Sequence, residues 1–274
     1  MTMKRFFKES ATIGAMCLLC TTMFCFSCKG KGGSQEGGTT GTECAEEQIM
    51  LDTINVKEYS DSIFLVEYHI ECFKNNTPLC NYINSQITSL ITDGKANGNN
   101  VRASLQTVAK EEIEKVRENA MEPDLAESVY DDPLFYIIKK GEFEQDCADS
   151  VWVYTTKIED FMGGAHGSYQ INTYNFSKKS GQQIELNQVI NLDKSDEIVE
   201  LLIAQLVKDK NCTSVEQLME ETALLTLNDM YVSDNFHLGK SGITFRYGQY
   251  SIGPYSAGIT EITLSYASLK KYLY

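Results

Sequence analysis

The side chains best suited to chemistry lie in a glycine-rich turn around a histidine. Gly163, Gly164 and Gly167 surround His166, and glycine lets the backbone adopt conformations closed to other residues and approach a ligand closely. An imidazole that titrates near neutral pH could serve there as a general base or as a binding group. The same glycines also suit a tight connection between strands, in which the imidazole hydrogen-bonds to backbone. The sequence favours this second interpretation, because it identifies no partner for His166.

A tyrosine-rich segment near the C-terminus is the second candidate. Tyr247, Tyr250 and Tyr255 stand beside Gly253-Pro254 and could form an aromatic wall for a sugar or a protein. They could equally be core and hairpin residues, because tyrosine buries its ring while its hydroxyl stays hydrated. Both interpretations stay open. The candidate binding residues are therefore Gly163, Gly164, His166, Gly167, Tyr247, Tyr250 and Tyr255.

Other chemistries find little support. His69 lies between Glu67 and Glu71 on a predicted strand and could join them around a metal, but solvated polar residues are the preferred interpretation. No Cys-x-x-Cys pair lies beyond residue 28, and the chain has no Gly-x-Ser-x-Gly elbow and no phosphate-binding loop. We therefore predict no catalytic residue, no metal and no cofactor. The alternative, an envelope glycan hydrolase, requires a carboxylate within about 3 Å of His166 or one bridging water away.

The N-terminus has the order of a secretory signal. Three basic residues precede an apolar run over 11–26, which is short for a transmembrane helix of about 20 residues. Ser27 before Cys28 resembles the processing site of a bacterial lipoprotein. We predict a signal peptide over 1–27, a lipid such as palmitate on Cys28, and a flexible tether over 28–48, which is rich in Gly, Ser, Thr and Glu. An uncleaved membrane helix is the alternative.

The net charge limits the classes of partner, and the number of cysteines indicates the state of the thiols. The net charge is −14, and loss of residues 1–27, with three basic residues and one acid, makes it about −16. Nucleic acid is excluded as a partner because binding it requires a basic face. Acidity favours cationic partners, or serves only to keep an exported protein soluble. Five of the nine cysteines would remain unmodified, and we expect buried free thiols rather than a disulfide framework. These five are Cys44, Cys72, Cys80, Cys147 and Cys212.

Two α+β units are expected to position the candidates. The N-terminal unit, 49–122, contains an alternating strand at 62–72 and helices at 77–93 and 101–120. A break at 123–133 separates it from the C-terminal unit, 134–274.

In the C-terminal unit, the glycine turn joins two predicted strands and the tyrosine segment follows a third. Strands grouped between helices indicate antiparallel sheets with helices on one face, an α+β fold. The predicted strands are 134–144, 151–160, 168–176, a short one at Ile184 and Leu186, 235–238, 242–247 and 259–266. The predicted helices begin at 195 and span 214–221, with an amphipathic end at 269–274.

Two motifs in this order resemble a known family. Gly163-Gly-Ala-His166 stands before a strand ending at Asn175-Phe176, and Tyr250-Ser-Ile-Gly-Pro-Tyr-Ser-Ala-Gly258 before a last apolar strand. This pattern resembles the C-terminal domain of lysozyme-sensing RsiV-type anti-sigma factors, which also occurs in PdaC-type peptidoglycan deacetylases. Residues 52–120 resemble the smaller domain that commonly precedes it. Asp61-Ser-Ile resembles an O-glycosylation pattern of exported Bacteroidota proteins, and we expect that origin.

The resemblance implies a binding module. Anti-sigma activity is not expected, because only the signal precedes Cys28, and deacetylase activity is not expected without a pair of neighbouring histidines. We expect a lipid-anchored cell-envelope protein, on the periplasmic side or in the outer membrane. It would be non-catalytic and would bind a lysozyme-like cationic hydrolase or cell-wall peptidoglycan. The alternatives are the glycan hydrolase with His166 and a structural envelope lipoprotein.

Overall fold

The protein is described by a computed structural model that covers residues 49–61, 63–98, 100–120, 133–222 and 230–274. All of these belong to one compact unit. The predicted signal peptide, the lipidation site Cys28, the tether and Cys44 lie outside the described residues. Cys72 and Cys80 are buried free thiols, as predicted, whereas Cys147 and Cys212 are only partly buried, which corrects the prediction for these two.

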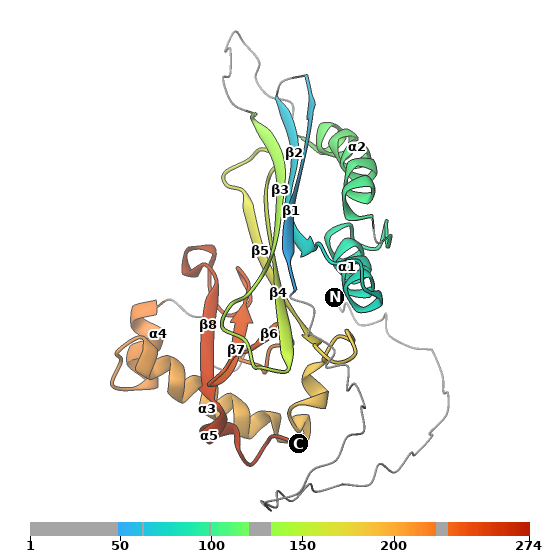
Figure 1. The fold of residues 1–274 in the computed structure, drawn as a ribbon. Helices are drawn as coiled ribbons and strands as arrows, with labels where there is room; N and C mark the ends of the chain where they lie inside the picture. The colour runs from blue at the N-terminus through green and yellow to red at the C-terminus, as the bar shows by residue number, and fades with distance from the viewer. Residues whose placement is uncertain (1–48, 62, 99, 121–132, 223–229) are drawn as a thin grey trace, which may run out of the picture. The chain divides into compact units, whose positions relative to one another are not determined.

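The larger sheet has five strands in sequence order. These are β1 (Leu51–Ser60), β2 (Phe64–Phe73), β3 (Phe135–Phe143), β4 (Val151–Phe161) and β5 (Ser168–Ser177). All neighbours are antiparallel except β2 and β3, which are parallel. The connection between these two contains α1 (Pro78–Ile91) and α2 (Val101–Asn119), and both helices lie on one face of the sheet (Figure 1).

Local signals explain why these elements form. The Thr77 hydroxyl accepts the Cys80 N–H at 3.2 Å and caps α1, whose first residue is proline. On β2, alternate residues such as Tyr68 and Ile70 are fully buried against the helices. No strand is predicted from the sequence at β1, because only Ile54 and Val56 of this edge strand are buried and two apolar residues leave a weak alternation.

A charged cluster is buried in this first core. The Glu112 carboxylate on α2 lies 3.1 Å from the Lys139 ammonium of β3 and 2.7 Å from that of Lys95. The Tyr68 hydroxyl donates to the same carboxylate at 2.5 Å, and the Lys139 ammonium also donates to the Ile91 carbonyl at 2.9 Å. Each charge in the cluster is therefore paired and hydrogen-bonded, as burial requires.

The smaller sheet has three antiparallel strands, β6 (Phe236–Leu238), β7 (Gly242–Tyr247) and β8 (Thr260–Ser265). Helix α3 (Ser195–Asp209) packs Ile198, Leu202 and Leu206 into the core of this sheet. The remaining helices are α4 (Val215–Thr222) and the short α5 (Tyr266–Leu269).

The predicted α+β class is confirmed: within the one compact unit, two sheets with helices packed on them each have their own hydrophobic core. The short strand predicted at Ile184 and Leu186 is wrong. Gln183 makes only an isolated bridge with Phe176, and Leu186–Gln188 form a 3₁₀ turn, η1, held by the Glu185 and Gln188 side chains. The unit boundaries at 122 and 134 stay predictions, and both predicted units contribute strands to the five-stranded sheet.

Candidate ligand-binding cleft

The glycine turn joins β4 to β5, and its backbone requires glycine. Gly163 and Gly164 have φ of 95° and 93°, values that disfavour any residue with a side chain. At Gly167 a Cβ atom would stand 2.5 Å from the Asp160 carbonyl oxygen. These three glycines therefore shape the connection, and of them only Gly167 lines the neighbouring cleft.

The turn meets the tyrosine segment around His166. The imidazole stacks on the Tyr255 ring, with centroids 3.9 Å apart, and the Tyr250 hydroxyl lies 3.5 Å from its Nε2. The Tyr255 hydroxyl donates to the Gly167 carbonyl at 3.2 Å. Two segments that lie far apart in the sequence thus share one aromatic surface, and both His166 and Tyr250 are exposed on it.

Tyr247 is placed elsewhere. Its ring is fully buried in the core of the three-stranded sheet, and its hydroxyl donates to the Tyr231 carbonyl at 2.7 Å. Burial raises the pKa of this hydroxyl, with a further contribution from Tyr231. Of the two interpretations of Tyr247, the structure favours the core residue.

A cleft of about 420 Å³ opens beside the aromatic surface. One wall is the start of β5, residues 168–172, and the other comes from 231–235 and 248–251. His166 and Tyr255 belong to its lining, and the exposed Tyr250 and Tyr231 add two further rings. The second wall was not predicted from the sequence, because its residues are single polar side chains in connections, without periodicity or motif.

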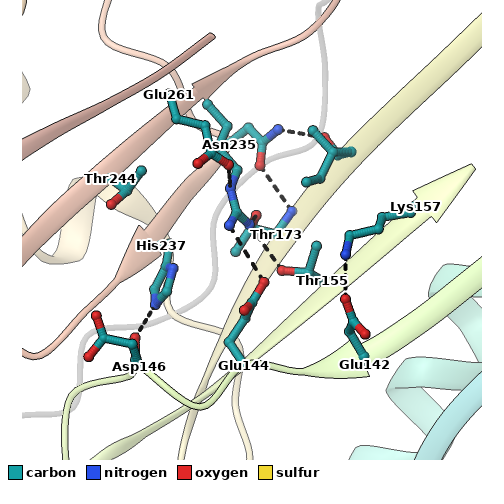
Figure 2. A network of polar contacts seen from close by, with 12 residues as sticks. Glu142, Glu144, Asp146, Thr155, Lys157, Thr173, Asn235, His237, Thr244 and Glu261 are labelled. Atoms are coloured by element: carbon teal, nitrogen blue, oxygen red, sulfur yellow. Dashed lines mark hydrogen bonds and ion pairs between the residues drawn. The ribbon is translucent and has the colours of Figure 1, made fainter. Parts of the chain in front are cut away.

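Side-chain carboxamides attach this second wall to the edge of β5. The Asn235 Oδ1 accepts the Thr173 N–H at 2.9 Å, and its Nδ2 donates to the Ile171 carbonyl at 2.7 Å. The Gln249 Oε1 accepts the Tyr169 N–H at 3.1 Å. Figure 2 shows Asn235 beside Thr173. These amides therefore satisfy backbone groups that a sixth strand would otherwise satisfy.

Further along β5, Asn175 makes the reciprocal contact with β6. Its Nδ2 donates to the Phe236 carbonyl at 2.8 Å, and its Oδ1 accepts the Leu238 N–H at 2.9 Å. Since Asn175 is only 1% exposed, these bonds are made away from water. The amides of Asn175 and Asn235 thus tie β5 to β6 and to the residue that precedes it.

Arg246 of β7 lines the cleft and is 7% exposed. Its Nε donates to Glu261 at 2.7 Å, and its Nη2 lies 3.5 Å from Glu144. Its Nη1 donates to the hydroxyls of Thr155 at 3.0 Å and Thr173 at 2.5 Å. Figure 2 shows these four partners converging from the two sheets. The guanidinium is thereby compensated and fixed in place.

No acid–base pair is formed by His166 within the described residues. Its Nδ1 lies 3.0 Å from the Gly167 carbonyl, and its other contacts are the two tyrosines. The carboxylate that the glycan-hydrolase hypothesis requires is not among its hydrogen-bond or ion-pair partners in the described part of the chain.

The metal trio around His69, which is only the less favoured interpretation of the sequence, is not formed either. Its Nε2 pairs with Glu67 at 3.1 Å and its Nδ1 lies 2.7 Å from Asn55 Oδ1, while Glu71 accepts the Phe143 N–H. Across the ranges that the structure describes, no group of three or more His, Cys, Asp or Glu side chains is arranged to hold a metal. Within the same ranges, no helix has the length and apolarity needed to cross a membrane.

Comparison with solved structures shows the same fold in two other bacterial proteins. A DUF3298 family protein from Bacteroides fragilis is 22% identical, with a TM-score of 0.71 over 82% of this chain and 94% of its own. One from Pseudomonas aeruginosa is 14% identical, with a TM-score of 0.59 over 83% of this chain and 95% of its own. No curated protein matches the chain.

The family comparison agrees with the resemblance found in the C-terminal half. Residues 186–267 match the model of DUF3298, described as a protein family of unknown function. This range contains α3, α4, the three-stranded sheet and the tyrosine segment, and so one wall of the cleft. Residues 186–267 are therefore similar to the DUF3298 domain.

Proposed function

We propose that this protein is an exported, lipid-anchored binding protein of the cell envelope, without catalytic activity, whose ligand occupies the cleft beside His166. The observation that carries the proposal is the cleft itself. Exposed aromatic rings and side-chain amides together line a space of about 420 Å³, and apolar surfaces with a few fixed polar groups are typical of ligand sites. The signal-like N-terminus and Ser27-Cys28 support export and a lipid on Cys28 in a bacterium such as one of the Bacteroidota.

Two ligand classes fit, and a cationic protein such as a lysozyme-like hydrolase is the first. The chain carries a net charge of −14, and Asp234, which lines the cleft, is exposed and makes no ion pair with the described residues. The resemblance to the lysozyme-sensing module supports the same class. Cell-wall glycan is the second candidate, because the Tyr255 and Tyr250 rings could stack against sugars.

The other hypotheses have less support. A glycan hydrolase would need an acid beside His166, and its described contacts are a carbonyl and two tyrosines. A purely structural lipoprotein would need no cleft at the glycine turn, whereas a cleft opens there.

Binding of the purified full chain to lysozyme and to soluble peptidoglycan fragments, at low and at physiological salt, tests the proposal. Tyr255→Ala removes the ring that stacks on His166. It should lower the affinity for the ligand about tenfold, which corresponds to the loss of one aromatic contact. Tyr59→Ala is the matched control, since Tyr59 is an exposed tyrosine on β1 that does not line the cleft. Equal affinity of wild type and Tyr255→Ala, or no affinity for either ligand, would overturn the proposal.

A further inference from the structure

Among the described residues, no hydrogen-bond partner is found for one pair of backbone groups on the outer edge of β5 in the cleft. Thr173 and Tyr169 direct their N–H groups away from β4, to Asn235 and Gln249, and Ile171 directs its carbonyl to Asn235. Because backbone direction alternates along a strand, the Tyr169 carbonyl and the Ile171 N–H point to the same side. Neither has a hydrogen-bond partner among the described residues, and both residues line the cleft.

We infer that the cleft binds an extended segment of a partner polypeptide, which pairs with β5 at this position and carries a basic side chain. In a parallel pair, a residue opposite Gln170 would donate its N–H to the Tyr169 carbonyl and accept the Ile171 N–H. Strand addition of this kind gives affinity through the main chain. The inference rests on the proposed function, because it assumes that the cleft is the binding site.

Asn235 shows which chemical group fits this edge. Two residues further along β5, the Asn235 carboxamide makes the equivalent pair of hydrogen bonds. Its Nδ2 donates to the Ile171 carbonyl and its Oδ1 accepts the Thr173 N–H. A primary amide can do this because one of its N–H bonds lies on the same side as its oxygen. A residue of an extended strand also presents its N–H and C=O to one side.

The same geometry disfavours the acetamido group of a sugar at this position. The acetamido group of an N-acetylated sugar is a trans secondary amide, so its N–H and C=O point in opposite directions. A single acetamido group can therefore satisfy either the Tyr169 carbonyl or the Ile171 N–H, but not both. Only a hydroxyl of a glycan could donate to the carbonyl and accept the N–H together, whereas an extended polypeptide does so in the ordinary register of a paired strand.

Charge in the cleft specifies the partner further. Two charged residues line it, and Arg246 is compensated by Glu261 and Glu144. Asp234 is exposed and forms no ion pair with the described residues. A lysine or arginine in the added segment would complement this uncompensated carboxylate.

The first test selects peptides from a randomised displayed library on the full chain and measures the selected peptides on variants. Ile171→Pro removes the unpaired N–H, and proline is tolerated on an edge strand where the N–H faces away from the sheet. Ile171→Val is the matched control that keeps the N–H. We expect peptides enriched in Lys or Arg, an affinity loss of about tenfold with Ile171→Pro, and little change with Ile171→Val. Thermal unfolding must show that both variants stay folded.

Amide hydrogen exchange measured by NMR gives a second readout that needs no variant. The Ile171 amide should exchange fast in the free protein and slowly with a selected peptide bound. The Gln170 and Asn172 amides, which face β4, should be protected in both states. Methylating the one peptide nitrogen that pairs with the Tyr169 carbonyl should abolish this protection.

The outcomes distinguish failure of the strand-addition inference from failure of the proposed cleft-binding function. If library peptides bind Ile171→Pro as tightly as wild type, or if the Ile171 amide stays unprotected, strand addition is wrong. If Tyr255→Ala still weakens those peptides, the cleft remains the binding site. If the library yields no binder while peptidoglycan fragments bind, and Ile171→Pro leaves that binding unchanged, the ligand is a glycan. If neither class binds, the proposed function fails as well.

Discussion

Glu112 is a buried acid that folding keeps charged. Burial alone would raise the pKa of its carboxyl, but Lys139, Lys95 and the Tyr68 hydroxyl outweigh burial and hold it below the usual value. A lowered pKa in the folded state means that the carboxylate stabilises the fold at neutral pH. This contribution is present above the unfolded pKa of about 4.3. It is lost as the pH falls through the folded pKa.

Glu112→Gln should lower the free energy of unfolding by about 3 kcal/mol at neutral pH, because it removes the buried carboxylate that pairs with Lys139 and leaves only the exposed Asp93 to compensate that ammonium. The difference from wild type should narrow as the pH falls below the unfolded pKa of about 4.3, because the unfolded chain takes up the proton before the folded one does. Urea unfolding at several pH values measures both effects. Glu114→Gln, on the exposed face of the same helix, is the control. A difference that stays constant down to pH 3 would contradict this account.

Some single residues of the candidate site could be predicted from the sequence, and others could not. The glycine turn and its histidine could be found because glycines clustered around one polar residue are a local signal. Asn235 and Gln249 could not be found, because each acts through one carboxamide on a strand more than sixty residues away. The interpretation of Tyr247 stayed open because a tyrosine at a strand end suits both core and surface, and only packing decides between them.

Arg246 on β7 connects the smaller sheet to the larger one through contacts that a lysine cannot reproduce. A guanidinium donates in several fixed directions, here toward Glu261 of β8 and the hydroxyls of Thr155 on β4 and Thr173 on β5. Lysine offers a single ammonium on a flexible stem. The contacts of β7 with β4 and β5 therefore depend on the shape of the Arg246 side chain as well as on its charge.

Arg246→Lys should lower the free energy of unfolding by about 2 kcal/mol, since two threonine hydroxyls and a carboxylate lose their donors. Thr244→Val on the same strand is the control, because its hydroxyl pairs only with Thr263 on the exposed face, and it should change stability by less than about 0.5 kcal/mol. Thermal or urea unfolding of both variants decides. Equal effects of the two changes would show that Arg246 contributes no more than a surface residue.

Most elements were predictable because their apolar residues repeat. Helix α2 keeps Leu105, Ile113 and Val116 on one buried face, and β2 alternates between buried and half-buried residues from Val66 to Cys72. β1 lacks such a repeat because it is an edge strand with one solvated face. The connection at Ile184 and Leu186 carries alternating apolar residues, yet its side-chain capping box and single bridge give a turn instead.

The net charge of the whole molecule should affect the rate of association with a partner more than the rate of dissociation. With a net charge of −14, the chain attracts a cationic partner over a distance that salt shortens, to about 8 Å at physiological ionic strength. The rate of complex formation therefore depends on the summed charge. The rate of dissociation depends on short-range contacts in the cleft.

For a basic peptide or lysozyme, the association rate constant should fall about tenfold between low and physiological salt, while the dissociation rate constant changes little. Stopped-flow measurements give both constants. Replacing the exposed Glu114 and Glu118 of α2 by Gln should slow association without altering dissociation, because neither residue lines the cleft. A salt effect confined to dissociation would place the attraction in the bound complex instead.

The parallel pairing of β2 with β3 also sets an order of folding. Phe64 pairs with Phe135, so the sheet cannot close until both helices and the connection to β3 have left the site of synthesis or export. Until then β2 has a bare edge, the kind of surface that joins other chains. The hairpins of the smaller sheet join near neighbours and close quickly. Slow closure at β2 is therefore the step at which this chain most needs protection from aggregation.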